Sequence, residues 1–357
     1  MRKKGSVDIP NPAPPQRDKE REPAVSSARP RLLIAGCDLK FIKPLIPYLE
    51  KEYEVRVDEW AGHTDHDEQR SAAYAKWADI IWCEWLLGNA VYYSKLKKEN
   101  QRLVIRGHRF ETTSRFGYQV DFSKVDMFFA VGYYYYELFQ KTFRIPREKM
   151  RLLSNYVEGS IYSMEKDDCA RYRVGLVGFI PDRKNLHHAL QIIRELRYAD
   201  HRFRLCLVGQ EPRQVSWVHN DPKQREYFNK CDKYILENNL EEYVIYLGFL
   251  ERSQIYNSLG YVLSLSNSES FHLALAEGAF AGCMGMVLKE WKGSEYLYPE
   301  RCLYNSTWDI IGDIVRAGRD DQFYRENVGS LHNFVERNYN IGNFLNNLHR
   351  YLKQLFI

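Results

Sequence analysis

The sequence predicts an α/β protein made of two doubly wound domains, each a parallel sheet with helices on both faces, that face each other across a cleft. Three observations support this fold class. The chain has 357 residues, more than one hydrophobic core usually organises. Short apolar runs alternate with helix-like stretches, which is the pattern of a parallel sheet. The alternation restarts near residue 171, which indicates a second sheet.

Composition narrows the class of protein further. Apolar residues make up 45% of the chain and aromatic residues 14%, enough for two sizeable cores. The net charge of 51 − 47 = +4 is too small to indicate a nucleic acid partner. The seven cysteines are scattered without a C-x-x-C pair, which favours reduced thiols over disulfides or structural zinc. No apolar stretch approaches a membrane span and no secretion signal is visible, so we expect a cytoplasmic protein.

Residues 1–30 differ from the rest of the chain. They hold six of the 13 prolines and no aromatic residue. Such a segment buries too little apolar surface to offset the entropy of ordering it. We therefore expect a disordered N-terminal lead.

The first domain is predicted to span residues 31–155. It opens with "RLLIAG", a short apolar run that ends in a glycine. Helix-like segments at 40–51 and 88–100 lie among the later strands. The predicted strands are 31–36, 54–60, 78–85, 102–108 and 125–132.

The second domain is predicted to span residues 156–339, after a connection at 152–163. Its first helix, 185–196, has apolar residues along one face, and Asn185 is placed to cap its start. The amphipathic C-terminal helix, about 340–357, is expected to pack back on the first domain. The predicted strands are 171–179, 203–209, 244–249, 261–266 and 285–290.

The stretch "SNSESFHLALAEGAF" places two glutamates around a helix start. We expect the preceding strand to end near Ser266 and the helix to begin near Ser270 or Phe271. The first N–H groups of a helix bind anions. Glu269 would then lie at the edge of an anion site, and Glu277, inside the helix, would need a donor partner such as a sugar diol.

Two glutamates separated by seven residues resemble the hallmark of retaining GT-B-fold glycosyltransferases of family 4, also called group 1. This resemblance implies that Glu269 touches the transferred sugar and that Glu277 binds the ribose of a nucleotide. It extends to "VGFIPDRKNLHHAL" (177–190), where the family carries basic ligands of a diphosphate. Arg183 and Lys184 occupy that place here.

The resemblance also covers the first domain and the other loops of the second. "IRGHRFE" (105–111) matches a segment whose histidine, here His108, faces the sugar. "VIYLGF" (244–249) and "LSNYVE" (153–158) fit the base-contacting loop and the interdomain linker. The remaining positions expected to contact the nucleotide sugar are Gly36, Gly178, Gly248, Ser270, Phe271, His272 and Leu273.

The implied activity is transfer of a sugar from a nucleoside diphosphate sugar, such as a UDP or GDP sugar, to a glycan, glycolipid, protein or other hydroxyl acceptor. Retention of anomeric configuration and a role in bacterial-type surface polysaccharide or glycoconjugate synthesis are expected. Fixed cations at the diphosphate would make a metal ion and any other cofactor unnecessary.

Two positions depart from the family pattern. Phe179 follows the strand glycine where the family has an arginine, for which Arg183 is a candidate substitute. His272 stands where the family has a glycine. These departures keep two alternatives open: a catalytically inactive GT-B-shaped binding or assembly module, and a sugar-nucleotide epimerase.

Three other segments have competing interpretations. "GHTDHDEQ" (62–69) contains metal-ligand residue types, but a polar loop fits the fold better. "GYYYYELF" (132–139) could stack on bases, although its helical spacing favours partial core packing. One helix carries Tyr92, Tyr93, Lys95, Lys97 and Lys98. Its exposed face is either simply solvated or a binding surface. The ligand of such a surface would be an anionic acceptor or the inner face of a membrane, contacted peripherally.

Overall fold

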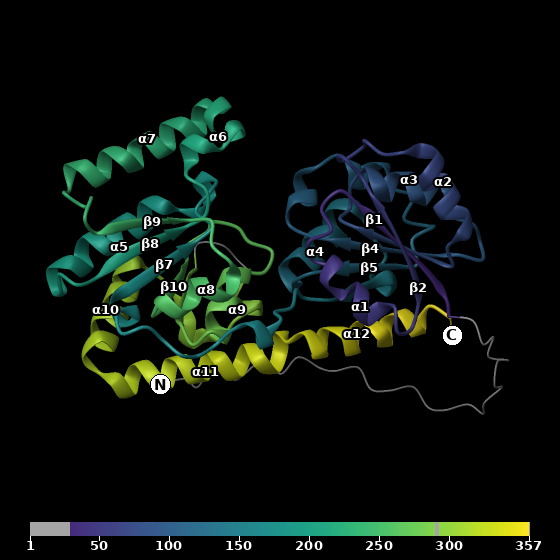
Figure 1. Cartoon of the computed structure of the whole chain (residues 1–357). Helices are drawn as coiled ribbons and strands as arrows, with labels where there is room; N and C mark the ends of the chain where they lie inside the picture. The colour runs from purple at the N-terminus through teal and green to yellow at the C-terminus, as the bar shows by residue number, and fades with distance from the viewer. Residues whose placement is uncertain (1–28, 290–292, 357) are drawn as a thin grey trace, which may run out of the picture.

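The computed structural model describes residues 29–289 and 293–356, so the predicted disordered lead lies almost wholly outside the described residues. The chain forms two α/β domains that lie side by side, joined along one side by the last two helices (Figure 1). The predicted fold class, two Rossmann-like domains in the GT-B arrangement, is confirmed.

The first domain contains a six-stranded sheet in which every pairing is parallel, in the order β2-β1-β3-β4-β5-β6. Its strands are β1 (Arg31–Gly36), β2 (Glu54–Glu59), β3 (Ile80–Glu84), β4 (Arg102–Gly107), β5 (Met127–Ala130) and β6 (Met150–Leu152). Its α-helices are α1 (Ile46–Leu49), α2 (Glu68–Trp77), α3 (Gly88–Leu96) and α4 (Tyr133–Phe143). The apolar runs formed strands because both faces of a parallel sheet are buried.

The second domain repeats this plan in the order β12-β11-β10-β7-β8-β9, again with parallel pairing throughout. Its strands are β7 (Arg173–Val177), β8 (Arg204–Val208), β9 (Val244–Gly248), β10 (Tyr261–Ser264), β11 (Met284–Leu288) and β12 (Leu303–Tyr304). Its α-helices are α5 (Leu186–Ala199), α6 (Ser216–Asn220), α7 (Pro222–Glu237), α8 (Arg252–Ile255), α9 (Leu273–Phe280) and α10 (Thr307–Arg319). The strand order reverses between β7 and β10, and ligands of such sheets bind at that point.

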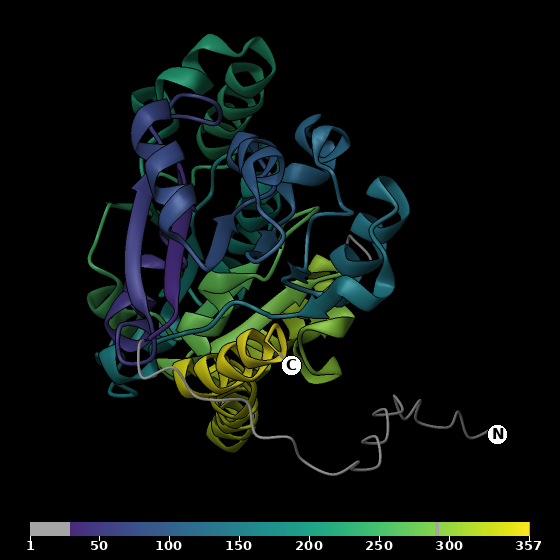
Figure 2. The ribbon, with the colours of Figure 1, turned by 90° about the vertical axis from the view of Figure 1, so that its right-hand side faces the viewer.

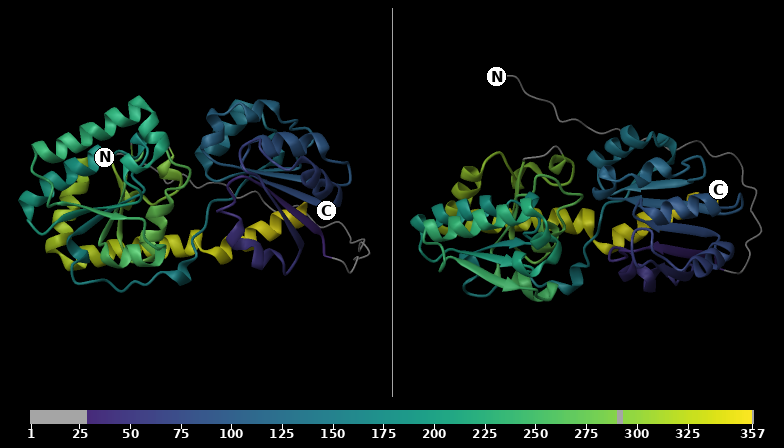
Figure 3. Two further views of the ribbon diagram at one scale, coloured as in Figure 1. Left: turned by 45° about the horizontal axis from the view of Figure 1, so that its top comes forward. Right: turned by 90° about the horizontal axis from the view of Figure 1, so that it is seen from above.

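Two C-terminal helices connect the domains. Helix α11 (Asp321–Tyr339) packs on the second domain, and α12 (Ile341–Gln354) continues beneath the first, as three other views also show (Figures 2 and 3). Phe344, Leu348 and Leu352 of α12 join the core formed by one face of the first sheet. No helix among the described residues is both long and apolar enough to cross a membrane.

The chain passes between the domains at two adjacent points. The Val157 N–H donates to the carbonyl of Tyr339 over 2.8 Å, and Val157 forms an isolated parallel bridge with Asn340. The Asn340 side chain accepts from the Asn343 N–H and so caps α12. The two crossings are therefore tied to each other.

Several predicted elements differ in extent from those observed, and the helix expected at 88–100 ends at Leu96. The helix expected at 40–51 is a 3₁₀ turn (Lys43–Leu45) followed by the four-residue α1. Pro44 and Pro47 stand at the starts of these turns, and a proline cannot donate the hydrogen bond that would continue a helix. The connection expected from 152 begins inside β6, which is too short to be recognised as an apolar run.

The helix α3 does not present the surface that the sequence predicts. Tyr93 is buried, with its hydroxyl donating to Asp58 over 2.6 Å. The side chain of Lys97 is only 10% exposed and pairs with Asp126 over 2.9 Å. Only Lys95 and Lys98 of the predicted lysine group are exposed.

The aromatic run 132–139 is partly core, as predicted. Tyr135 and Phe139 are buried, whereas Tyr133 is 43% exposed. The polar loop 62–69 is held by its own contacts: His66 stacks on Trp60, and Asp67 caps α2 by accepting from the Arg70 N–H. No group of His, Cys, Asp and Glu in the described part of the chain is placed to hold a metal ion.

Docking of α12 should contribute to the stability of the first domain. Replacing the fully buried Leu348 with alanine is expected to cost about 2–5 kcal/mol in the free energy of unfolding. Urea unfolding followed by tryptophan fluorescence measures this, since Trp82 lies in the same core. The exposed control Asn346→Ala should change stability by less than about 0.5 kcal/mol. Equal stability of both variants would show that α12 does not belong to this core.

Candidate active site

The loops after β7 and β10 meet at the point where the strand order of the second sheet reverses. The β7 loop contains a 3₁₀ turn (Asp182–Lys184) that presents Arg183 and Lys184. The β10 loop runs from Leu265 to His272 and contains Glu269. The Asn267 N–H donates to the Arg183 carbonyl over 3.0 Å, so the backbones of the two loops are joined.

A partly buried ion cluster lies where these loops meet, and its side chains are 27% (Arg183), 23% (Lys184) and 14% (Glu269) exposed. Arg183 Nη1 donates to Oε1 of Glu269 over 3.0 Å, and Lys184 Nζ donates to the same oxygen. Ser266 Oγ donates to it over 2.9 Å. Burial alone would raise the pKa of Glu269, but the charges of Lys184 and Arg183 lower it to about 2. The carboxylate is therefore ionised at neutral pH, and it shares its charge between two cations.

Arg183 and Asn185 hold the β10 loop in place. Arg183 Nη1 also donates to the Ser268 carbonyl over 2.9 Å. Asn185 precedes α5 in a left-handed conformation, with φ of 56°. Its side chain donates to the Leu265 carbonyl over 2.7 Å and makes no capping hydrogen bond to α5. Asn185 does stand at the predicted N-cap position of α5. Its side chain does not cap the helix, however, but links the β7 loop to the β10 loop.

Helix α9 begins at Leu273, two to three residues later than the sequence predicts. His272 delays it, because this residue adopts a left-handed conformation with φ of 57°. Left-handed φ values favour glycine and cost other residues roughly 1–2 kcal/mol. The first N–H groups of α9, at Leu273 and Ala274, precede its first internal hydrogen bonds and are available to an anion.

His272 itself is buried and neutral. Its Nδ1 lies within hydrogen-bond distance of the Ser264 hydroxyl. Burial, with the charges of Lys184 and Arg183, lowers the pKa of His272 to about 4, even though Glu269 acts in the opposite direction. The imidazole therefore adds no charge to the ion cluster at neutral pH.

Ser270 and Phe271 have structural partners. Ser270 Oγ accepts from the backbone N–H of Arg109 in the first domain over 2.8 Å. The Phe271 ring is buried and packs edge-on against Tyr339, with 4.7 Å between ring centroids. The side chain of Phe271 is therefore part of the core, and contact of Phe271 with a nucleotide sugar stays a prediction.

Glu277 lies on the buried side of α9. Tyr256 donates its hydroxyl to Oε2 of Glu277 over 2.8 Å. The glutamate is 6% exposed. Sequence reasoning missed Tyr256 because it belongs to another turn, 21 residues away. The tyrosine hydroxyl orients the carboxylate at the predicted ribose position.

Three loop glycines line the carboxyl ends of adjacent strands. Gly178, Gly209 and Gly248 have φ values of 72°, 134° and 67°. The Gly178 N–H donates to Val208 and the Gly209 N–H to Gly248, each over 2.8 Å. These φ values are unfavourable for any residue with a Cβ, which is why the turns need glycine. Gly209 was missed by the sequence-based prediction.

Gly36 is required for a different reason. A Cβ at this position would lie 2.8 Å from the Glu84 carbonyl oxygen and 3.2 Å from Leu39. The first strand thus packs closely against the end of β3, which is its neighbour in the sheet. Contact of Gly36 with a nucleotide sugar stays a prediction.

His108 is enclosed at the end of β4 and is only 2% exposed. Its ring contacts both Phe41 and Trp85, with centroid distances of 5.0 and 4.1 Å. Burial lowers the pKa of His108 to about 4, against the effect of the Glu84 carboxylate, so the ring is neutral. Contact of His108 with a sugar stays a prediction.

A charged pair beneath His108 fixes its ring. Nε2 of His108 lies 3.0 Å from Oε1 of Glu84, which also accepts from Arg106 Nη1 over 2.9 Å. Burial opposes ionisation of Glu84, but Arg106 and His108 hold its pKa below the ordinary value. Since Glu84 is ionised, the neutral His108 carries its proton on Nε2.

Glu111 is a fully buried carboxyl that the sequence-based prediction did not single out. Its Oε1 accepts from the backbone N–H groups of Leu86 and His108, each over 3.0 Å. Burial raises the pKa of Glu111 to about 7. This carboxyl holds the two loops that follow β3 and β4.

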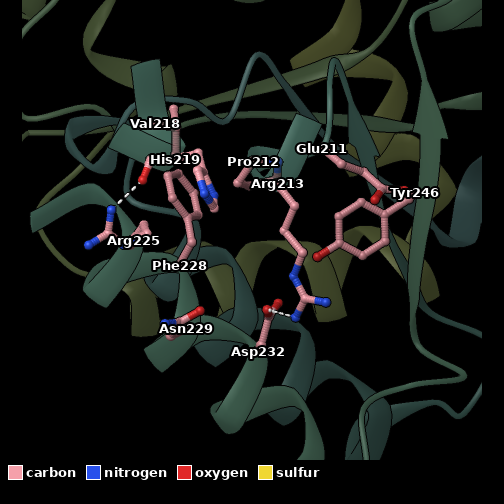
Figure 4. Close-up of a pocket in the computed structure, with 10 residues that line it drawn as sticks. All are labelled: Glu211, Pro212, Arg213, Val218, His219, Arg225, Phe228, Asn229, Asp232 and Tyr246. Atoms are coloured by element: carbon pink, nitrogen blue, oxygen red, sulfur yellow. Dashed lines mark hydrogen bonds and ion pairs between the residues drawn. The ribbon is translucent and has the colours of Figure 1, made fainter. Parts of the chain in front are cut away.

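A pocket of the second domain lies elsewhere. It has a volume of about 530 Å³ and sits between the insertion after β8, helix α7 and the edge strand β9 (Figure 4). Arg213 and the Tyr246 hydroxyl point into it, and Arg213 pairs with Asp232 over 2.6 Å. Of the predicted site, only Tyr246, within the base-contacting segment 244–249, lines this pocket.

A known protein family matches part of the second domain. Residues 170–287 match the family of glycosyl transferases group 1. The group 1 segment contains the β7 loop, the β10 loop and both glutamates. The match to group 1 predicted from the sequence is thereby confirmed for this segment, whereas family 4 and retention stay predictions. No protein of curated function matches the chain.

Several solved structures of other proteins have a fold similar to that of this chain. HepE of Anabaena, crystallised in complex with UDP and glucose, has a TM-score of 0.74 and 14% sequence identity over 91% of this chain and all of its own. Sucrose-phosphate synthase from Thermosynechococcus elongatus has a TM-score of 0.68 and 13% identity over 92% and 99%. A glycosyltransferase from Rickettsia africae has a TM-score of 0.65 and 12% identity over the same fractions.

The raised pKa of Glu111 predicts a pH dependence of stability. Between an unfolded value of about 4.3 and a folded value near 7, the folded state binds the proton more tightly, so the free energy of unfolding falls as pH rises. Glu111→Gln should remove this slope. Between pH 4 and 8 the stability of the variant relative to wild type should rise by about 2–4 kcal/mol.

Urea unfolding at a series of pH values measures this difference. Glu99→Gln, at an exposed position of the same domain, is the matched control and should leave the slope unchanged. Parallel pH profiles for Glu111→Gln and wild type would show that Glu111 has an ordinary pKa.

Proposed function

We propose that this protein is a retaining glycosyltransferase that moves a sugar from a nucleoside diphosphate sugar to a hydroxyl acceptor. The main support for this proposal is the cluster of Glu269, Arg183 and Lys184, which lies where the strand order of the second sheet reverses. Structures in complex with UDP and with UDP-glucose are known for HepE, which shares the fold. UDP sugars are therefore the first donors to test.

The second domain would bind the donor. Arg183, Lys184 and the first N–H groups of α9 present positive charge where the diphosphate would lie. Glu277, oriented by Tyr256, would accept hydrogen bonds from the ribose hydroxyls. The turn of Gly248 and the 87% exposed Phe249 would border the base.

The chemistry needs stabilisation of a departing diphosphate. When the bond between the anomeric carbon and the phosphate oxygen breaks, the electron pair stays on the oxygen and positive charge develops on the sugar ring. Fixed cations stabilise the departing charge without a metal ion. Glu269, freed from part of its pairing with Lys184 when the diphosphate binds, would hold the sugar.

Retention follows from attack on the same face. The acceptor oxygen would form the new bond to the anomeric carbon while the diphosphate leaves, and the acceptor proton would pass to the departing phosphate oxygen. The first domain would present this acceptor, with the His108 segment fixed by Glu84 and Glu111. A cytoplasmic enzyme of surface polysaccharide or glycoconjugate synthesis would use such a reaction.

Incubation with UDP and GDP sugars, with release of free nucleotide as the readout, tests the activity. We expect slow hydrolysis of one donor that persists in excess EDTA. Binding without hydrolysis would favour an inactive module, and an altered sugar would favour an epimerase. Loss of activity in EDTA would contradict metal independence.

The ribose assignment has its own test. Glu277→Gln should weaken binding of the nucleoside diphosphate by about 1–3 kcal/mol, since a hydrogen bond to a charged group is lost. Calorimetry measures this change, and the exposed Glu241→Gln is the control. Unchanged affinity in a folded Glu277→Gln variant would count against the ribose role.

Peripheral membrane contact is a further part of the proposal, now limited to Lys95 and Lys98. Each exposed lysine should contribute about 1 kcal/mol at an anionic surface. Changing both to glutamate should reduce co-sedimentation with anionic vesicles at low salt. If the wild type stays in the supernatant, or the variant sediments equally, this surface does not bind membranes.

A further inference from the structure

Arg109 lies where the first domain touches the β10 loop. Its backbone N–H donates to Ser270 Oγ over 2.8 Å, and its carbonyl accepts from Thr112 Oγ1 over 2.7 Å. The backbone is therefore held on both sides. Its half-buried guanidinium makes no hydrogen bond or ion pair with the described part of the chain.

This guanidinium is close to the ion cluster of the second domain. Burial and then the charge of Arg183 lower the pKa of Arg109, whereas Tyr135 and Glu269 act in the opposite direction. Tyr135 itself is joined to the β10 loop, with its hydroxyl 3.0 Å from Ser268 Oγ. The backbone of Arg109 thus lies against the β10 loop, one residue from Glu269, on the side of the opposite domain.

The charges at this place do not balance. Arg109, Arg183 and Lys184 are three cations, and Glu269 is the one carboxylate that two of them share. Glu111 also acts on Arg109, but with a pKa near 7 it carries only part of a negative charge. A half-buried excess of between one and two positive charges is stabilised by a bound anion of similar charge.

Phe179 explains why a cation from the first domain is needed. This residue follows the strand glycine, where the resemblance places an arginine. Its ring is 1% exposed and packs against Tyr246, with 6.1 Å between centroids. The β7 loop therefore supplies no cation at this position, and Arg183 is already engaged with Glu269 and Ser268.

We propose that Arg109 binds the diphosphate of the donor from the first-domain side and takes the place of the loop arginine that Phe179 replaces. This inference rests on the proposed function and adds a catalytic residue to it. Arg109 stabilises the negative charge on the leaving diphosphate as the bond to the anomeric carbon breaks. Because it belongs to the first domain, it also makes tight donor binding depend on contact between the domains.

Calorimetry on the full chain tests the assignment with UDP, GDP and the corresponding nucleosides. Arg109→Gln should weaken binding of the preferred diphosphate about 10- to 100-fold, as expected for loss of a charge-assisted hydrogen bond. Affinity for the nucleoside should stay within about twofold. Arg109→Lys should recover part of the loss, and the defect should shrink as salt is added.

Two controls separate this inference from the proposed function. Arg115→Gln removes the same charge from an exposed position of the same domain and should leave affinity unchanged. Arg183→Gln tests the diphosphate site itself. If Arg183→Gln loses diphosphate affinity and Arg109→Gln does not, the inference on Arg109 is wrong and the proposed function stands.

The remaining outcomes are equally decisive. If wild type binds neither UDP nor GDP, the proposed function fails and the inference fails with it. Equal losses for diphosphate and nucleoside in Arg109→Gln would show a structural role for the residue. The rate of donor hydrolysis at saturating donor should also fall in Arg109→Gln. A variant that had lost only ground-state binding would keep its rate at saturation.

Discussion

The shared carboxylate of Glu269 is the interaction on which the site depends. One partly buried oxygen accepts from Arg183, Lys184 and Ser266, and in this way it joins loops from β7 and β10. Removing water from a carboxylate costs free energy unless cations or hydrogen-bond donors replace that water, so the cations and the carboxylate stabilise one another. Because one carboxylate serves two cations, the cluster keeps an excess of positive charge. That excess is the reason for proposing that the cluster binds an anion and is not only a structural ion pair.

The same loop also joins the two domains. Ser268 contacts Tyr135 of the first domain, and Ser270 contacts Arg109. The residues on either side of Glu269 are therefore in direct contact with the first domain. At the other side of the molecule α12 continues the chain of the second domain into the core of the first. Domain contact would therefore be linked physically to the proposed donor binding. A donor that binds between the loops and Arg109 would favour the arrangement in which both domains touch it.

Much of the fold could be predicted because parallel strands are buried on both faces and appear as apolar runs. The pair Glu269 and Glu277 was recognisable because a strand end and a helix define their spacing. The late start of α9 could not be predicted, because no local sequence signal indicates that a histidine adopts a left-handed φ. Tyr256 and Arg109 reach the site from distant elements, so only the three-dimensional arrangement places them there. Periodicity along one helix likewise could not distinguish a buried tyrosine from an exposed one on α3.

The most direct test of this account is the structure of the chain with its preferred nucleoside diphosphate bound. The account predicts phosphate oxygens on Arg183, Lys184 and the first N–H groups of α9, with Lys184 no longer donating to Glu269. It also predicts the ribose within hydrogen-bond distance of Glu277. A nucleotide bound in the pocket beside Tyr246 and Arg213, with the Glu269 cluster unchanged, would contradict it.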